Sequence, residues 1–246
     1  MAAGKGTRMK DPTKAKVMYP ILGKPMLHYV LSLTEDLKTD RVIVIVGHQK
    51  TIVQDYLRDS HPSVESVVQE PQLGTGHAVM QATAALESFQ GYIIVLSGDV
   101  PLLTKESMSA LIAHHVETGA KATILTAEMS DPGGYGRIIR GKDGNVAKIV
   151  EHRDATADEL KVREINSGIY VFEKDNLFAG LKQIKAENVQ HEYYLTDVFG
   201  YFAVQRWKVA GLKVNLEDEI RGINNFEQLE EARTVMEGRV KSCKTN

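Results

Sequence analysis

Buried apolar runs that alternate with helical patterns are the feature of this sequence that most limits its fold. Residues 41–46 and 92–96 are apolar runs rich in β-branched side chains, which is typical of strands buried on both faces. Helical spacing of apolar residues follows these runs, over 51–57 and 105–117. Strands that alternate with helices predict a parallel sheet with right-handed crossover connections.

The second half of the chain is richer in strands and turns. A hairpin is expected from 137 to 150, a strand over 164–172 and a long amphipathic helix over 224–240. No linker or internal repeat is visible, so we expect one α/β domain: a Rossmann-like, mostly parallel sheet flanked by helices, with a smaller β-rich lobe. Its expected parts are a first half (1–120), the β-rich lobe (121–223), a closing helix (224–240) and a tail (241–246).

Charge and cysteine content exclude several function classes. The 246 residues carry 30 Lys+Arg and 32 Asp+Glu, a net charge of −2, so nothing favours a nucleic-acid or anionic-membrane partner. The single cysteine, Cys243, excludes an internal disulfide framework and fits a reducing compartment. No signal peptide or apolar run of membrane-spanning length is visible, so we expect a cytoplasmic protein.

The first residues have the composition of an anion-binding loop. Gly4 and Gly6 let backbone N–H groups approach an anion closely, and Lys5, Arg8 and Lys16 supply cations nearby. Backbone amides combined with clustered cations suit a polyphosphate. The alternative is a flexible basic N-terminus.

Polar residues follow the expected strands, where open parallel sheets bind ligands. Gln69 and the Gly74-Thr75 turn offer an amide, close backbone approach and a hydroxyl, which suit the edge of a pyrimidine base; the alternative is a turn with a helix cap at Thr75. Asp99 ends a buried strand beside the phosphate loop, a suitable place to hold Mg²⁺, which prefers oxygen ligands. The alternative is a turn-forming aspartate.

Further candidates lie in the β-rich lobe. Glu151 and Asn166 each close a strand, and their side chains suit the hydroxyl and amide groups of a sugar. The Gly134-Tyr135-Gly136-Arg137 turn offers a backbone N–H to the same ligand. Each of these residues is otherwise an ordinary loop residue. Asn224 is either the N-cap of the last helix or a second metal ligand.

Taken in order, these motifs resemble one family, the sugar-nucleotide nucleotidylyltransferases, and within it the uridylyltransferase domain of the bacterial bifunctional N-acetylglucosamine-1-phosphate uridylyltransferase/glucosamine-1-phosphate acetyltransferases. The resemblance covers about residues 1–240 and implies the nucleotide-diphospho-sugar transferase fold. The motifs that carry it are Ala2 to Met9, Gln69 with Gln72 to Ala78, Gly98 to Leu102, Gly134 to Ile138, Ile149 to His152, Glu164 to Gly168, Glu192 to Asp197 and Gly222 to Asn225.

The resemblance implies that UTP and N-acetylglucosamine 1-phosphate form UDP-N-acetylglucosamine and pyrophosphate with Mg²⁺, a reaction that feeds peptidoglycan and cell-wall biogenesis. It implies a nucleotide-binding first half and a sugar-binding lobe. The implied catalytic residues are Arg8, Lys16 and Asp99. The nucleotide-binding candidates are Ala2, Ala3, Gly4, Lys5, Gly6, Thr7, Gln69, Gly74, Thr75 and Gly98. The sugar-binding candidates are Gly136, Glu151, Asn166 and Asn224, and the metal ligands are Asp99 and Asn224.

The sequence departs from the family pattern in three places. The family has a short apolar strand before the Ala-Ala-Gly, so we expect either a truncated start or a first methionine recorded too far downstream. Ala15 precedes Lys16 where the family commonly has proline, a change expected to be mild. No hexapeptide repeats of a left-handed β-helix acetyltransferase domain follow the last helix, so we expect this chain to lack the second activity and, with it, the main trimer contact. A monomer or weak homo-oligomer is therefore expected.

Two other functions remain open at this stage. The first is the same reaction with another sugar 1-phosphate, such as glucose or N-acetylgalactosamine 1-phosphate, or with another nucleotide. The second is a non-catalytic sensor that binds sugar nucleotides. The complete set of Arg8, Lys16, Asp99 and Asn224 favours an enzyme.

Overall fold

A computed structural model describes residues 1–9, 11, 13–215 and 217–244. The chain forms two compact units that are discontinuous in sequence. Unit 1 comprises the described residues within Met1–Pro71, Ser97–Lys105 and Asp218–Asn246, and unit 2 those within Gln72–Leu96 and Glu106–Glu217.

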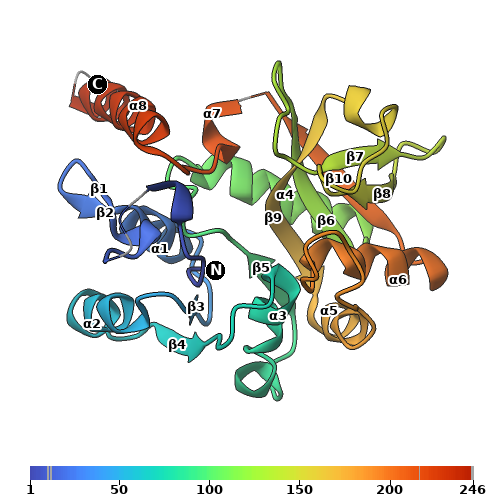
Figure 1. Cartoon of the computed structure of the whole chain (residues 1–246), viewed down its shortest axis with the longest axis horizontal. Coiled ribbons are helices and arrows are strands. Elements are labelled where there is room, and N and C mark those ends of the chain that lie inside the picture. The colour runs from blue at the N-terminus through green and yellow to red at the C-terminus, as the bar shows by residue number, and fades with distance from the viewer. Residues whose placement is uncertain (10, 12, 216, 245–246) are drawn as a thin grey trace. The chain divides into compact units, whose positions relative to one another are not determined.

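Unit 1 is built on a short parallel strand pair (Figure 1). Strand β3 (Ile43–Val46) pairs in parallel with β4 (Glu65–Val68), and Ala2 forms an isolated parallel bridge to Val46. The other elements of unit 1 are η1 (Thr7–Met9), η2 (Lys16–Met18), the antiparallel pair β1 (Pro20–Ile21) and β2 (Lys24–Pro25), α1 (Met26–Asp36), α2 (Lys50–Ser60), α7 (Glu217–Ile220, whose first residue belongs to unit 2) and α8 (Phe226–Lys244).

Two apolar clusters stabilise unit 1. One joins α1 and α2 to β3 and includes Ala2, Leu27, Val46 and Leu57. The other packs α8 against the β1–β2 hairpin and the start of α1, and includes Ile21 and Met26, which are fully buried. The first cluster extends to the N-terminal residues, so burial of Ala2 fixes the path of the chain into the glycine-containing loop.

Unit 2 contains a six-stranded mixed sheet with the order β10-β6-β9-β7-β8, in which β5 also pairs with β9. β10 (Val209–Val214) is parallel to β6 (Ala122–Glu128), whereas β9 (Glu164–Glu173) is antiparallel to β6, β5 (Tyr92–Val95) and β7 (Arg137–Arg140). β7 and β8 (Val146–Val150) form the expected hairpin. The expectation of a mostly parallel sheet therefore holds for β3–β4 and β6–β10 only. The long central strand β9 is antiparallel to its partners β5, β6 and β7.

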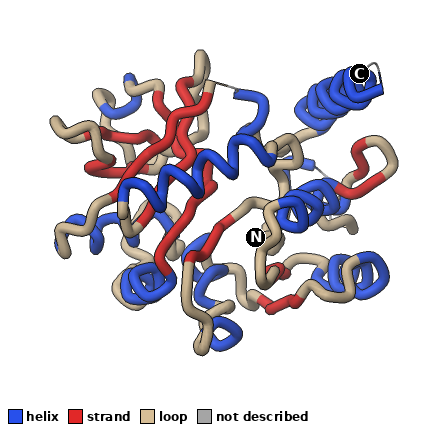
Figure 2. Tube along the Cα trace, turned by 180° about the vertical axis from the view of Figure 1, so that it is seen from behind, coloured by secondary structure: helices blue, strands red, loops and turns tan. Residues whose placement is uncertain are grey.

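Helices cover both faces of this sheet. The remaining elements of unit 2 are α3 (Thr75–Met80), η3 (Ala84–Leu86), α4 (Lys105–Thr118, whose first residue belongs to unit 1), η4 (Glu159–Lys161), α5 (Lys174–Leu181), η5 (Leu195–Asp197) and α6 (Val198–Val204). Tyr170 and Phe172 of β9 stack with Phe199 of α6. On the other face, α4 crosses the strands (Figure 2) and its His115 contacts Thr123 and Tyr92.

The strands and helices expected from the sequence are present, with shifted ends. The last helix, α8, begins at Phe226 and continues to Lys244, past the expected end at Val240, so only 245–246 of the expected tail lie outside the described residues. In space, segments 97–105 and 218–244 pack with unit 1, whereas the expected functional division near residue 120 stays a prediction. Among the described residues, no helix combines the length and the apolar character needed to cross a membrane.

Candidate active site

The phosphate-binding and metal-binding candidates of unit 1 converge on the Lys16 ammonium. Lys16 Nζ donates hydrogen bonds to Asp99 Oδ2 and, over 3.0 Å, to Asn224 Oδ1. Arg8 Nη2 donates to the same Asn224 oxygen over 2.8 Å. The Lys16 and Asp99 side chains are only 15% and 20% exposed. Side chains that are far apart in sequence thus form one partly buried polar cluster, which we call the Lys16 cluster.

Backbone contacts fix Asp99 in the Lys16 cluster. The Gly98 N–H donates to Met1 O over 2.9 Å, and the Ile223 N–H donates to Asp99 O over 2.9 Å. A Cβ atom at Gly98 would lie 3.0 Å from Val17 Cγ1 and 3.1 Å from Met1 O, so glycine allows this close approach. Hydrogen bonds therefore hold the Gly98-Asp99 backbone to Met1 on one side and to Ile223 on the other.

The structure distinguishes between the two roles considered for Asn224, the N-cap of the last helix and a residue of the site. The side chain that caps α8 belongs to the next residue, Asn225, whose Oδ1 accepts a hydrogen bond from the Gln228 N–H over 2.8 Å. Gln228 Oε1 in turn accepts from the Asn224 N–H over 2.7 Å, one residue before the N-cap. Asn224 Nδ2 donates to Gly222 O over 2.9 Å, which orients Oδ1 toward Lys16. The Asn224 side chain is thus available to the site and does not cap the helix.

The N-terminal loop is anchored at both ends. Ala2 and Ala3 are buried beside β3, where the Ala2 N–H donates to Ile45 O over 2.8 Å. Gly4 and Lys5 are exposed. Gly6 has a φ of +60°, and a Cβ atom there would lie 2.8 Å from Lys16 Cβ, so the loop packs directly on Lys16. The backbone of Thr7 begins η1.

The two predicted base-binding segments fall in different units. Gln69 follows β4 in unit 1, is buried, and donates its backbone N–H to Val46 O over 2.8 Å. In unit 2, Gly74 precedes α3, and Thr75 Oγ1 accepts a hydrogen bond from the Leu195 N–H over 2.9 Å. The Thr75 hydroxyl therefore ties α3 to residue 195 and does not cap the helix.

The sugar-binding candidates of unit 2 lie next to one another. The Asn166 N–H donates to Gly136 O over 2.9 Å. A Cβ atom at Gly136 would lie 3.5 Å from Asn166 Cβ and 3.5 Å from Glu151 Oε2. The predicted grouping of Gly136, Glu151 and Asn166 is therefore present within unit 2, and we call it the Gly136 row.

The carboxylate of the Gly136 row has a perturbed environment. Burial raises the pKa of Glu151, and the negative charge of Asp154 raises it further. A hydrogen bond from Thr196 Oγ1 to Glu151 Oε1, 2.8 Å long, acts in the opposite direction. Asn166 Nδ2 donates to the hydroxyl of Tyr170 over 2.8 Å. Neither Thr196 nor Tyr170 is among the predicted site residues. Tertiary packing brings Thr196 to Glu151, whereas Tyr170 lies on the same strand as Asn166.

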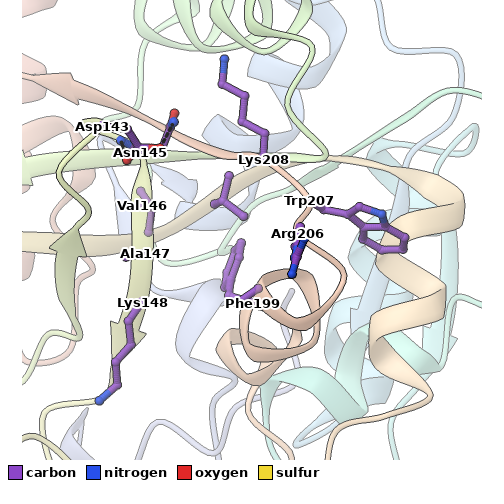
Figure 3. Close-up of a pocket in the computed structure, with 11 residues that line it drawn as sticks. Asp143, Asn145, Val146, Ala147, Lys148, Phe199, Arg206, Trp207 and Lys208 are labelled. Atoms are coloured by element: carbon purple, nitrogen blue, oxygen red, sulfur yellow. Dashed lines mark hydrogen bonds between the residues drawn. The ribbon is translucent and has the colours of Figure 1, made fainter.

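A pocket of about 540 Å³ lies elsewhere on unit 2, between β8 and the end of α6 (Figure 3). Its lining includes Val146, Phe199, Arg206 and Lys208, and none of the predicted site residues. The Lys208 ammonium is bound to Thr118 O over 3.1 Å.

The chain is similar to known proteins in sequence and in fold. The sequence profile of the family described as Nucleotidyl transferase matches residues 1–211. A relative named Bifunctional protein GlmU from Exiguobacterium sibiricum is 48% identical over 239 residues, which cover 97% of this chain and 52% of the relative. The protein of that name from Geobacillus thermodenitrificans is 45% identical over 240 residues, covering 98% and 51%. The chain thus spans about half the length of the curated relatives it matches.

A solved structure of UDP-glucose pyrophosphorylase complexed with UDP-glucose is similar in fold. It aligns with a TM-score of 0.78 at 19% identity, covering 97% of this chain and 97% of that chain. The profile match includes residues of both units, among them Arg8, Lys16 and Asp99 of the Lys16 cluster and the whole Gly136 row. This chain is a member of the nucleotidyl transferase family.

Proposed function

We propose that this chain is a uridylyltransferase, which joins UTP and N-acetylglucosamine 1-phosphate into UDP-N-acetylglucosamine and releases pyrophosphate. The observation that carries the proposal is the Lys16 cluster, in which Lys16 and Arg8 meet the oxygens of Asp99 and Asn224. The Gly136 row supplies polar groups suited to an acetamido sugar. Relatives named Bifunctional protein GlmU add support, being 48% and 45% identical to this chain.

The residues of the Lys16 cluster fit a divalent cation. Membership of the family supports a divalent metal cofactor in general. Asp99 Oδ2 and Asn224 Oδ1 already share one cation, the Lys16 ammonium, so a carboxylate and an amide oxygen converge as a hard metal ion requires. We assign Mg²⁺ to these two oxygens. When bound, it supplies positive charge against the phosphates of the nucleotide.

The chemistry that we assign is a direct in-line displacement. An oxygen of the sugar 1-phosphate attacks the α-phosphorus of UTP. The bond between the α-phosphorus and the oxygen that bridges it to the β-phosphate breaks, and pyrophosphate leaves. The attacking phosphate has a second pKa near 6 and is already an anion at neutral pH, so the reaction needs no general base. The protein's contribution is then positioning and charge neutralisation by Lys5, Arg8, Lys16 and the loop amides.

Pyrophosphate release tests the proposal directly. With UTP, N-acetylglucosamine 1-phosphate and Mg²⁺ we expect turnover, which excess EDTA abolishes. Parallel reactions replace UTP with CTP, GTP or TTP, and replace the sugar with glucose 1-phosphate. Equal turnover with all nucleotides would contradict the assignment to uridine. If micromolar protein released no pyrophosphate but UDP-N-acetylglucosamine still raised its melting temperature, the chain would be a sensor.

We expect the affinity for UDP-N-acetylglucosamine to fall as the pH is lowered through the raised pKa of Glu151. The ionised carboxylate accepts charge-assisted hydrogen bonds from sugar hydroxyls, which are about twice as strong as neutral ones, so protonation should weaken binding about tenfold. Calorimetry between pH 5 and 8 measures this effect. The pyrophosphate of UDP-N-acetylglucosamine is esterified at both ends and has no ionisation near pH 6, so the ligand does not contribute a titration of its own.

The Glu151→Gln variant should bind with little dependence on pH. A pH dependence unchanged in this variant would exclude Glu151 as its source. The free energy of unfolding should depend on pH in the opposite sense. Because the pKa of Glu151 is higher in the folded than in the unfolded chain, protonation of this residue stabilises the fold. This contribution is complete below the unfolded pKa, near 4.5, and is lost as the pH rises through the raised pKa of the folded state.

A further inference from the structure

Arg137 is a buried arginine beside the Gly136 row that the reaction described above does not use. It is the first residue of β7 and is 2% exposed. Among the described residues its guanidinium forms no salt bridge, the charge of Asp131 acts on it only beyond ion-pair distance, and Nε is buried without a hydrogen-bond partner. A buried charge without a salt bridge costs free energy, so its position calls for a compensating role.

The Arg137 guanidinium holds the preceding loop. Its Nη1 donates to Pro132 O over 2.8 Å and also to Tyr135 O. The loop contains a further turn, in which the Tyr135 N–H donates to Pro132 O over 3.2 Å, and Gly134 has a φ of +80°. The two carbonyls that Nη1 binds flank this turn, so one side chain fixes the segment that leads into Gly136.

Strand register places that segment opposite the candidate sugar ligands. Arg137 pairs with Val150 on one side and with Ile165 on the other. Because both pairings are antiparallel, Gly136 comes opposite the residues that follow, Glu151 and Asn166. The loop that Arg137 fixes therefore ends at the centre of the Gly136 row.

We propose that Arg137 is a positioning residue, which orders residues 132–136 so that the Gly136 backbone is presented to the acetamido sugar together with Glu151 and Asn166. This inference rests on the proposed function. Arg137 touches the loop carbonyls and not the substrate. Its effect should therefore appear in the recognition of the sugar phosphate and leave the recognition of UTP unchanged.

The Arg137→Lys variant tests this role, because a lysine keeps the charge but its side chain ends one bond short of Nη1, the atom that binds both carbonyls. We expect the KM for N-acetylglucosamine 1-phosphate to rise about ten- to hundredfold, as for a misplaced binding group, while the KM for UTP stays within twofold. The matched control is Arg140→Lys at the other end of β7, where the arginine binds Glu164 and two backbone carbonyls. This control should lose stability without a change in either KM.

Binding measurements complement the kinetics and do not depend on turnover. Measured by calorimetry, the affinity of Arg137→Lys for UDP-N-acetylglucosamine should be lower than that of the wild type, and its affinity for UTP should be unchanged. If Arg137→Lys does not fold, Arg137→Gln, which retains an amide donor, replaces it. An unchanged KM for the sugar phosphate, or an equal rise in both KM values, would overturn the positioning role. Failure of the proposed function is distinct, because the wild-type chain itself would then release no pyrophosphate.

Discussion

Replacing Asp99 by alanine should lower kcat for pyrophosphate release at least about a hundredfold, the scale seen when a preorganised charge-stabilising group is removed. The change removes the carboxylate that contacts Lys16 and that we assign to the metal, and it leaves the ammonium with Asn224 Oδ1 at 3.0 Å. It should also lower the free energy of unfolding by about 1–3 kcal/mol, between the values for exposed and fully buried ion pairs, because both side chains are mostly buried. Stopped pyrophosphate assays and urea denaturation followed by circular dichroism measure the two effects.

Two further variants separate charge from packing. Asp99→Asn keeps an oxygen for Lys16 but removes the charge, so it should regain stability, remain slow and need more Mg²⁺ for half-maximal activity. Asp59→Ala is the matched control in unit 1, because its carboxylate pairs with Arg58 where both side chains are more than two-thirds exposed. Asp59→Ala should leave kcat unchanged and cost less than about 1 kcal/mol. If Asp99→Ala turned over at the wild-type rate, Asp99 would not be part of the active site.

The sequence predicted the elements of the fold better than their directions. The apolar run that became β9 looks the same whether its neighbours run parallel or antiparallel, because side chains alternate in both cases. The mixed sheet therefore appeared only in the structure. Packing also returns segments 97–105 and 218–244 to unit 1, and no change in composition along the sequence marks them.

Candidate site residues could be proposed where a loop follows a strand and its residue types suit one ligand. Asp99 and the N-terminal glycines are such candidates, and in the structure Asp99 and Gly6 both lie against Lys16. The choice between Asn224 and Asn225 as the α8 cap was not predictable, since adjacent asparagines have equal capping tendency and only the contacts to Gln228 and Lys16 separate them. Arg137 and Thr196 were missed because their partners lie in loops that tertiary packing brings together.

The Gly74→Ala variant should lower the free energy of unfolding of unit 2 by roughly 2–6 kcal/mol. Gly74 has a φ of +107°, a conformation that costs a residue with a Cβ atom about 1–3 kcal/mol. The added Cβ would also lie 2.6 Å from Tyr193 O and 2.9 Å from Glu192 Cβ, and such overpacking costs a further 1–3 kcal/mol or so. Trp207, the single tryptophan, lies in unit 2, so its fluorescence during urea denaturation reports the unfolding of this unit.

The control for the Gly74 variant is Gly119→Ala in the same unit. Gly119 also has a positive φ, +60°, but a Cβ atom there would meet nothing within 4 Å, so only the backbone term of about 1 kcal/mol applies. The difference between the two variants therefore reports the contact with residues 192–193 together with the larger backbone cost at the φ of +107°. Leu73 O and the Gly76 N–H are hydrogen-bonded to Tyr193 over 2.8 and 2.7 Å, so displacing Gly74 should also loosen these bonds. Equal destabilisation by both substitutions would mean that residues 72–76 are not held against Tyr193, and the ordering of Thr75 for a nucleotide would then lose its structural basis.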